Sequence, residues 1–166
     1  MKASHRALDL LRRAAQDAMH KAIAPYSHFQ VGAAIKTKRG KIITGHNIEC
    51  SSYSLTICAE RVALFKALSE GERNFTAIAV VASSGDFCPP CGACRQVLMD
   101  FAPELTVYLF NHQGETKTLK LSELLPLSFS SANLRESSNL THSNHAATLL
   151  QTQSKAHSSK GAYRKS

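Results

Sequence analysis

The sequence has no run of 18 or more apolar residues, which excludes a transmembrane helix. It has no internal repeat, and its 166 residues, 43% of them apolar, suit a single compact domain with one sizeable core. It also lacks a disulfide framework, because its five cysteines are odd in number and cluster between Cys50 and Cys94. We therefore expect a soluble, cytoplasmic protein whose cysteines serve a metal or catalytic site.

Acidic residues are scarce: 12 Asp and Glu face 20 Lys and Arg, for a formal net charge of +8. Such a charge can indicate nucleic-acid binding, so its location matters. Residues 132–166 hold five basic residues and one acidic residue, which is half of the excess. This polar segment cannot bury enough apolar surface to offset its ordering entropy. We expect a folded domain over 1–131 and a disordered basic tail over 132–166, with no membrane or specific nucleic acid as partner.

The first expected element is a helix. Leu8, Leu11 and Ala15 recur at helical spacing, with Ala18 and Ala22 continuing the pattern. Ser4 is a possible N-cap, and Pro25 stops the pattern.

The following segments alternate between strands and helices. The nearly all-apolar run at 75–82 is typical of a central strand buried on both faces. The strands at 106–110 and 115–120 are joined by too short a link for a crossover, so they should pair antiparallel. The remaining expected elements are a hairpin of 29–37 and 41–48, helices at 58–68 and 91–101, and a helical piece at 121–125. This order predicts the α/β class, as a three-layer α/β/α sandwich around a mixed five-stranded sheet.

Cys58, Cys91 and Cys94 form a candidate metal site with Glu60. The pattern is C-A-E at 58–60, followed 33 positions after Cys58 by C-G-A-C, which itself follows Pro90. Cys91 and Cys94 share one helical face and can bind one Zn²⁺ at about 2.3 Å from each sulfur. Three protein ligands leave the fourth zinc position open for water, and Glu60 beside the metal is then a candidate general base.

Each part of this pattern has an ordinary explanation when taken alone. Cys-x-x-Cys also serves thioredoxin-like disulfide exchange and structural Cys₄ zinc sites. A carboxylate such as Glu60 is favoured in the first turn of any helix by the macrodipole. Cys88 completes a C-x₂-C-x₂-C run that is similar to part of an iron–sulfur ligand set. A non-enzymatic zinc or iron–sulfur binding module is therefore an alternative, although it leaves the C-A-E pairing unused.

Three thiolates would give a zinc site a net charge of −1, which makes a bound water less acidic than three neutral ligands do. Helix N-termini favour anions through their backbone N–H groups. Arg61 directly follows Glu60, and we assign it a hydrogen bond to the thiolates.

Four motifs together resemble the small homotetrameric cytidine deaminases. They are P-Y-S-H-F-Q-V-G-A-A at 25–34, N-I-E at 47–49, C-A-E-R at 58–61 and P-C-G-A-C-R-Q-V at 90–97. The likeness spans roughly residues 8–131. It implies a hydrolase with one zinc per subunit that converts cytidine and 2′-deoxycytidine to uridine and 2′-deoxyuridine plus ammonia, in pyrimidine salvage. Water then attacks C4 of cytosine, while Glu60 carries the proton to ring N3 and afterwards to the departing ammonia.

The resemblance also implies the residues that bind substrate. Asn47 and Glu49 would bind the ribose hydroxyls, Phe29 would pack beside the nucleoside, and the Ala59 backbone would read the base. L-L-P-L-S-F at 124–129 is similar to the family's C-terminal motif, which implies that Phe129 stacks in a neighbouring subunit's site. From the residues alone, Phe129 fits a core position equally well. Asn47 and Glu49 fit a turn cap, although alternation along an extended segment directs both to one face.

Two places depart from the family pattern. Cys50 follows N-I-E where the family commonly has Asn, and C-P at 88–89 replaces an apolar residue and a serine.

Two other deaminase classes are alternatives. Polynucleotide and transfer-RNA deaminases use the same metal chemistry, but they usually have His in place of Cys58 and a helix that makes the last two strands parallel. Blasticidin-type nucleoside-antibiotic deaminases share Cys-Ala-Glu and Pro-Cys-x-x-Cys, whereas Arg61 and the Phe129 motif fit cytidine better.

Overall fold

The computed structural model describes residues 2–134, with side chains from residue 5 onward. The chain divides into one unit, Met1–Ser128, and a second unit that begins at Phe129. Residues 131–134 of the second unit are helical. Almost all of the tail expected over 132–166 lies outside the described residues, so that expectation stays a prediction.

A mixed five-stranded sheet in the order β2-β1-β3-β4-β5 forms the centre of the first unit. Only β3 and β4 of these strands pair parallel, and the three other neighbouring pairs are antiparallel. The α/β class and the antiparallel pairing of the last two strands are thus confirmed. The elements in chain order are α1 (Lys2–Met19), β1 (Val31–Thr37), β2 (Ile42–His46), a 3₁₀ turn (Tyr53–Leu55), α2 (Ala59–Ser69), β3 (Phe75–Ala82), α3 (Gly92–Phe101), β4 (Thr106–Phe110), β5 (Thr116–Lys120) and α4 (Leu121–Leu124).

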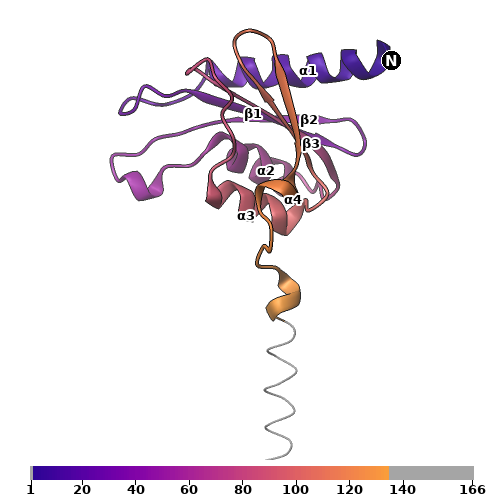
Figure 1. Ribbon diagram of the computed structural model, residues 1–166. Coiled ribbons are helices and arrows are strands. Elements are labelled where there is room, and N and C mark those ends of the chain that lie inside the picture. The colour runs from indigo at the N-terminus through magenta and orange to yellow at the C-terminus, as the bar shows by residue number, and fades with distance from the viewer. Residues whose placement is uncertain (1, 135–166) are drawn as a thin grey trace, which may run out of the picture. The chain divides into compact units, whose positions relative to one another are not determined.

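Helices cover the sheet in two layers. The helix α1 lies on one side of the sheet, and α2 and α3 lie on the other (Figure 1). This is the expected three-layer sandwich. None of the helices in the described part of the chain is long and apolar enough to span a membrane.

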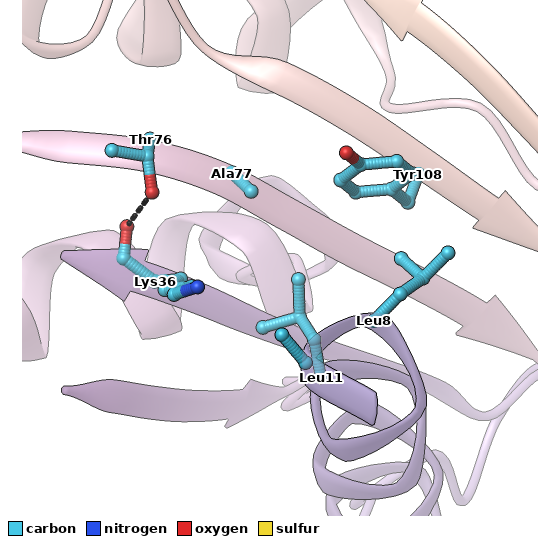
Figure 2. Close-up of a pocket in the computed structure, with 7 residues that line it drawn as sticks. Leu8, Leu11, Lys36, Thr76, Ala77 and Tyr108 are labelled. Atoms are coloured by element: carbon cyan, nitrogen blue, oxygen red, sulfur yellow. Dashed lines mark hydrogen bonds between the residues drawn. The ribbon is translucent and has the colours of Figure 1, made fainter. Parts of the chain in front are cut away.

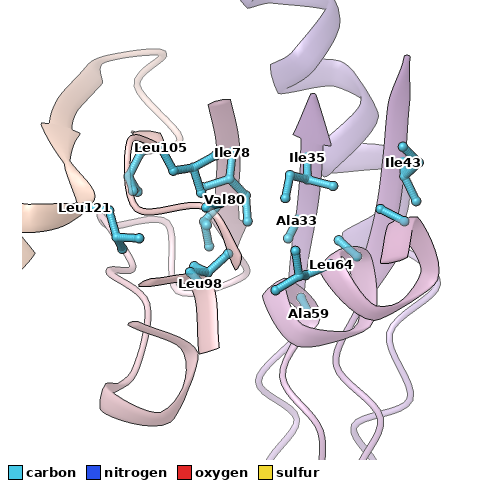
Figure 3. Packing of buried hydrophobic residues seen from close by; sticks show 14 of the residues in the cluster. Ala33, Ile35, Ile43, Ala59, Leu64, Ile78, Val80, Leu98, Leu105 and Leu121 are labelled. Atoms are coloured by element: carbon cyan, nitrogen blue, oxygen red, sulfur yellow. The ribbon is translucent and has the colours of Figure 1, made fainter. Parts of the chain in front are cut away.

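The strand β3 shows why its segment is almost wholly apolar. Ile78 and Val80 belong to the core under α2 and α3 (Figure 3), whereas Ala77 and Ala79 belong to the core under α1. Both faces of the strand are therefore buried, as the sequence predicts. Burial of a Leu or Ile side chain of this kind stabilises the fold by about 1.5–3 kcal/mol.

The first helix differs from its expected bounds at both ends. It begins at Lys2, so Ser4 lies inside the helix and is not its N-cap. It ends at Met19, and Ala22 lies in the turn beyond it. The apolar face itself is confirmed, because Leu11, Ala15 and Ala18 are buried.

Two glycines set how closely the helices approach the sheet. A Cβ atom on Gly32 would lie 2.0 Å from the Ala15 carbonyl oxygen in α1. A Cβ atom on Gly45 would lie 2.4 Å from the Ala59 carbonyl oxygen and from the Ala63 nitrogen in α2. Because the obstacles are backbone atoms, only glycine permits these contacts.

We expect Gly45→Ala to lower the free energy of unfolding by about 1–3 kcal/mol or more, because α2 must move away from β2. Gly92→Ala is the matched control, since a Cβ atom there meets nothing within 4 Å. Its effect should stay within about 1 kcal/mol, the range of helix propensities. Urea denaturation at equal zinc content measures both values, and similar losses in the two variants would contradict the steric explanation.

Candidate active site

Three thiols meet where the N-termini of α2 and α3 come together. Cys58 is the N-cap of α2 and Cys91 is the N-cap of α3, and both have extended backbone angles. Cys94 lies in the first turn of α3 and is fully buried. The three sulfur atoms all lie within 4.8 Å of one another. Each therefore stands beside backbone N–H groups that have no partner within the helix and that favour negative charge.

The spacing of these sulfur atoms fits a zinc ion. Two ligands at about 2.3 Å in tetrahedral geometry lie about 3.8 Å apart, and Cys58 Sγ and Cys91 Sγ are 3.7 Å apart. Within the described residues, the three-thiol group does not include Cys50 or Cys88. Three thiolates with an exposed member, Cys91, suit a site whose fourth position stays open.

Of the three thiols, Cys58 has a lowered pKa and is therefore favoured as the thiolate. The hydrogen bond from the Cys94 thiol, followed by Arg61 and Cys91, lowers the pKa of Cys58 to about 5. Donation to Cys58 and burial raise the pKa of Cys94. Arg61 Nη2 lies 3.6 Å from Cys58 Sγ, and Arg61 Nε is buried without a partner among the described residues. The guanidinium is thus close to the sulfur, as its assigned role requires.

Glu60 lies in the first turn of α2 and is only 4% exposed. Burial, with the negative charge of Cys58 as a smaller cause, raises the pKa of Glu60 to about 7. A carboxyl group in this range can both accept and release a proton near neutral pH, which is what acid–base catalysis requires.

A cavity of about 190 Å³ opens beside the thiols. Its lining residues are Phe29, Val31, Asn47, Thr56, Cys58, Glu60, Cys88, Pro89 and Cys91. A larger cavity of about 300 Å³ lies on the α1 face, where Leu8 and Leu11 face Ala77 and Tyr108 (Figure 2). The larger cavity has no acid or thiol in its lining, so we place the chemistry in the smaller one.

Asn47 lines this cavity, and its side chain also holds the backbone of two other lining residues, Phe29 and Val31. Its Oδ1 accepts a hydrogen bond from Val31 N at 2.8 Å, and its Nδ2 donates to Phe29 O at 2.9 Å. The buried carboxamide thereby extends the pairing of β1 and β2 by one step. The Phe29 side chain, which also lines the cavity, is held in place through its own backbone.

Glu49 binds the loop before Phe29 and is not among the residues that line the cavity. Its Oε2 accepts hydrogen bonds from Tyr26 N at 3.0 Å and Ser27 N at 3.1 Å, and its Oε1 accepts one from the Ser27 hydroxyl. The Ser27 hydroxyl is the largest of the causes that lower the pKa of Glu49. The carboxylate is therefore ionised and holds the loop that leads to Phe29.

The two remaining predicted residues lie outside the cavity lining. Ala59 is fully buried as the first residue of α2, where its N–H has no partner within the helix. Phe129 belongs to the second unit and is 57% exposed. The binding roles of Ala59 and Phe129 stay predictions.

Several residues that line the cavity had no predicted place in the site. Thr56, Val31 and Pro89 line the cavity, and Thr56 could have been found by its alternation with Cys58 along an extended segment. Cys88 also lines it, and burial raises the pKa of this thiol to about 11.

Arg95 has a position that no local pattern could indicate. Its Nε donates to Pro90 O at 2.7 Å and its Nη1 to Leu124 O at 2.9 Å. The side chain thereby joins the segment before Cys91 to α4.

Known proteins are similar to this chain in sequence. Residues 6–110 match the family described as the cytidine and deoxycytidylate deaminase zinc-binding region. The chain is 52% identical over 128 residues to a cytidine deaminase of Halalkalibacterium halodurans, which covers 76% of this chain and 97% of the relative. It is 36% identical over 107 residues to a blasticidin-S deaminase of Bacillus cereus, covering 60% of this chain and 76% of the relative.

The solved structures agree with the sequence relatives. The 1.6 Å crystal structure of cytidine deaminase from Burkholderia pseudomallei matches with a TM-score of 0.71 and 48% sequence identity, covering 73% of this chain and 98% of that chain. The family match, the identity to curated relatives and the similarity to a solved structure all indicate the same family. This chain therefore belongs to the cytidine and deoxycytidylate deaminase family.

Proposed function

We propose that the protein hydrolytically deaminates free cytidine and 2′-deoxycytidine, giving uridine or 2′-deoxyuridine and ammonia, as a step of pyrimidine salvage. The observation that carries this proposal is the buried carboxyl of Glu60 in one small cavity with Cys58 and Cys91. A proton carrier and an open three-thiol metal site in one cavity are the two parts that metal-assisted hydrolysis requires.

The residues divide the chemistry between them. Cys58, Cys91 and Cys94 would hold a zinc ion, which would act as a Lewis acid and lower the pKa of a water molecule. Glu60 accepts a proton from that water, delivers it to ring N3 as oxygen adds to C4, and transfers the second proton of the water to the leaving amino group. Arg61 offsets the negative charge of the thiolates through Cys58.

The proposed substrate contacts involve residues in and around the cavity. The Asn47 amide nitrogen has two N–H donors, and Phe29 O takes one of them, so one N–H serves a ribose hydroxyl. Phe29 packs against the nucleoside, and the Ala59 N–H reads the base. Glu49 binds a sugar hydroxyl through its ionised carboxylate.

The assembly is proposed to be a cytoplasmic homotetramer in which Phe129 stacks on the nucleoside of a neighbouring subunit. Exposure of Phe129 and of Leu127, which precedes it by two residues, supports a role outside the subunit's own core. The folded domain over 1–131 acts on free nucleosides, without a membrane or a specific nucleic acid as partner.

The sequence match to a blasticidin-S deaminase keeps nucleoside-antibiotic deamination as a second candidate. Antiparallel pairing of β4 with β5 argues against a polynucleotide deaminase. One assay compares the candidates: purified protein is incubated with cytidine, 2′-deoxycytidine, adenosine, blasticidin S and a cytosine-containing oligonucleotide while ammonia release is followed. Turnover of blasticidin S alone would replace the proposed substrate, and no turnover at all would favour a binding module.

We expect elemental analysis to find about one zinc per subunit, because three thiols at this spacing provide an open tetrahedral site. Cys91→Ser should lose most of the zinc, whereas the matched variant Cys50→Ser should retain it. Iron with inorganic sulfide, or a fourth protein ligand such as Cys88, would contradict this assignment.

Glu60→Gln should keep zinc and fold but lose activity by at least roughly 10²- to 10⁴-fold, since a neutral amide cannot carry the proton. Steady-state kinetics on zinc-loaded protein measures the loss. Glu104→Gln, at an exposed position, is the control and should keep its activity. Activity near the wild-type rate in zinc-loaded Glu60→Gln would remove Glu60 from the mechanism.

Phe129→Ala should raise KM for cytidine by up to about tenfold, the scale of a lost aromatic stacking contact, without loss of zinc. Light scattering should show a tetramer. Mixing subunits that carry Phe129→Ala with subunits that carry Glu60→Gln should restore sites of full affinity, because some sites then pair an intact Glu60 with a neighbour's Phe129. Absence of such sites in mixed tetramers, or an active monomer, would refute the contribution in trans.

A further inference from the structure

The Ser27 hydroxyl occupies one of the acceptor sites of the Glu49 carboxylate. An ionised carboxylate has about four lone-pair sites, two on each oxygen. Tyr26 N and Ser27 N fill both sites on Oε2, and the Ser27 hydroxyl fills one site on Oε1. Glu49 is therefore left with one free acceptor site.

The orientation of the Ser27 hydroxyl is set by its other partner. Phe29 N donates to Ser27 Oγ at 3.0 Å, so Ser27 accepts from Phe29 and directs its own proton to Glu49. His28 between them has a φ of 57°, in the left-handed region that a residue other than glycine adopts only when its surroundings hold it there. The loop is thus fixed in the conformation that keeps the Ser27 hydroxyl on the carboxylate.

We propose that Ser27 determines sugar specificity by limiting Glu49 to a single sugar hydroxyl. The inference rests on the proposed function, in which Glu49 binds the sugar. With one acceptor site, Glu49 can bind the 3′-hydroxyl that ribose and 2′-deoxyribose share, and it gains nothing from the 2′-hydroxyl. Ser27 therefore makes the site tolerant of both sugars.

Removal of the Ser27 hydroxyl tests the proposal. Ser27→Ala frees a second acceptor site on Oε1, so the vicinal 2′- and 3′-hydroxyls of cytidine can both donate to Glu49. The ratio of kcat/KM for cytidine to that for 2′-deoxycytidine should rise about three- to tenfold, the scale of one additional hydrogen bond. Ser27→Thr retains a hydroxyl and should keep the wild-type ratio.

The ratio separates specificity from loop stability. A looser loop impairs both substrates alike and cancels in the ratio. Ser83→Ala is the matched control, because Ser83 Oγ accepts Gln30 N at 3.0 Å and so anchors the same loop without touching Glu49. Ser83→Ala should lower both kcat/KM values without changing their ratio.

Each outcome has one meaning. An unchanged ratio in Ser27→Ala, or the same rise in Ser83→Ala, refutes the role of Ser27 and leaves the proposed function standing. A wild-type protein that deaminates neither nucleoside refutes the proposed function and this inference together. If Ser27→Ala does not fold, Ser27→Cys replaces it, since a thiol is a weaker donor at the same backbone and should raise the ratio by a smaller factor.

Discussion

Three sulfur atoms that are to share one metal ion repel one another once they are ionised, so the fold must hold them together against that repulsion. Here the N-termini of two helices do so, because α2 and α3 pack on the same face of the sheet and bring Cys58, Cys91 and Cys94 within reach of one ion. The backbone N–H groups of both first turns then lie where the negative charge gathers. The rest of the site is arranged around this convergence.

Glu60 owes its chemistry to the same convergence. Cys58 is the N-cap of α2, and the first turn that follows it places Glu60 in the interior. Burial there makes the ionised form of the Glu60 carboxyl costly. An exposed carboxyl group would instead stay ionised at neutral pH, so it would be a poor proton donor. Position along one helical turn thus separates a thiol of the metal site from a buried carboxyl whose pKa is raised.

Local sequence patterns predicted the presence and type of the helices and strands well, but predicted where they begin and end less well. The strand at 75–82 is correct because burial on both faces leaves an unmistakable apolar run. Ser4 is not the cap because α1 begins at Lys2, well before Leu11, the first of its residues found buried, and periodicity indicates only the buried face. The position of the cysteines near helix N-termini was predictable because the C-x-x-C spacing and the helical pattern after each cysteine are local, although Cys58 and Cys91 are N-caps rather than first-turn residues.

The polar surroundings of the cavity could not be read in this way. The hydrogen bonds of Glu49 with Tyr26 and Ser27 join residues more than 20 positions apart, as do those of Arg95 with Leu124. Alternation correctly suggested that Asn47 is near the site, yet nothing local shows that its carboxamide is used by the backbone of Phe29 and Val31. Such hydrogen bonds depend on which distant segments of the chain the tertiary structure brings together.

The carboxamide of Asn47 has two roles, so a substitution at this position affects both the backbone and the cavity. Because it completes a strand pairing and lines the cavity beside the thiols, its removal leaves the half-buried Val31 N–H and the Phe29 carbonyl without these hydrogen bonds before any substrate is present. Under the proposed function, a loss of turnover on replacing Asn47 combines a folding defect with a binding defect, and the two cannot vary independently. If the proposed roles hold, sugar recognition can diverge more easily through the exposed loop at Ser27 than through this buried amide.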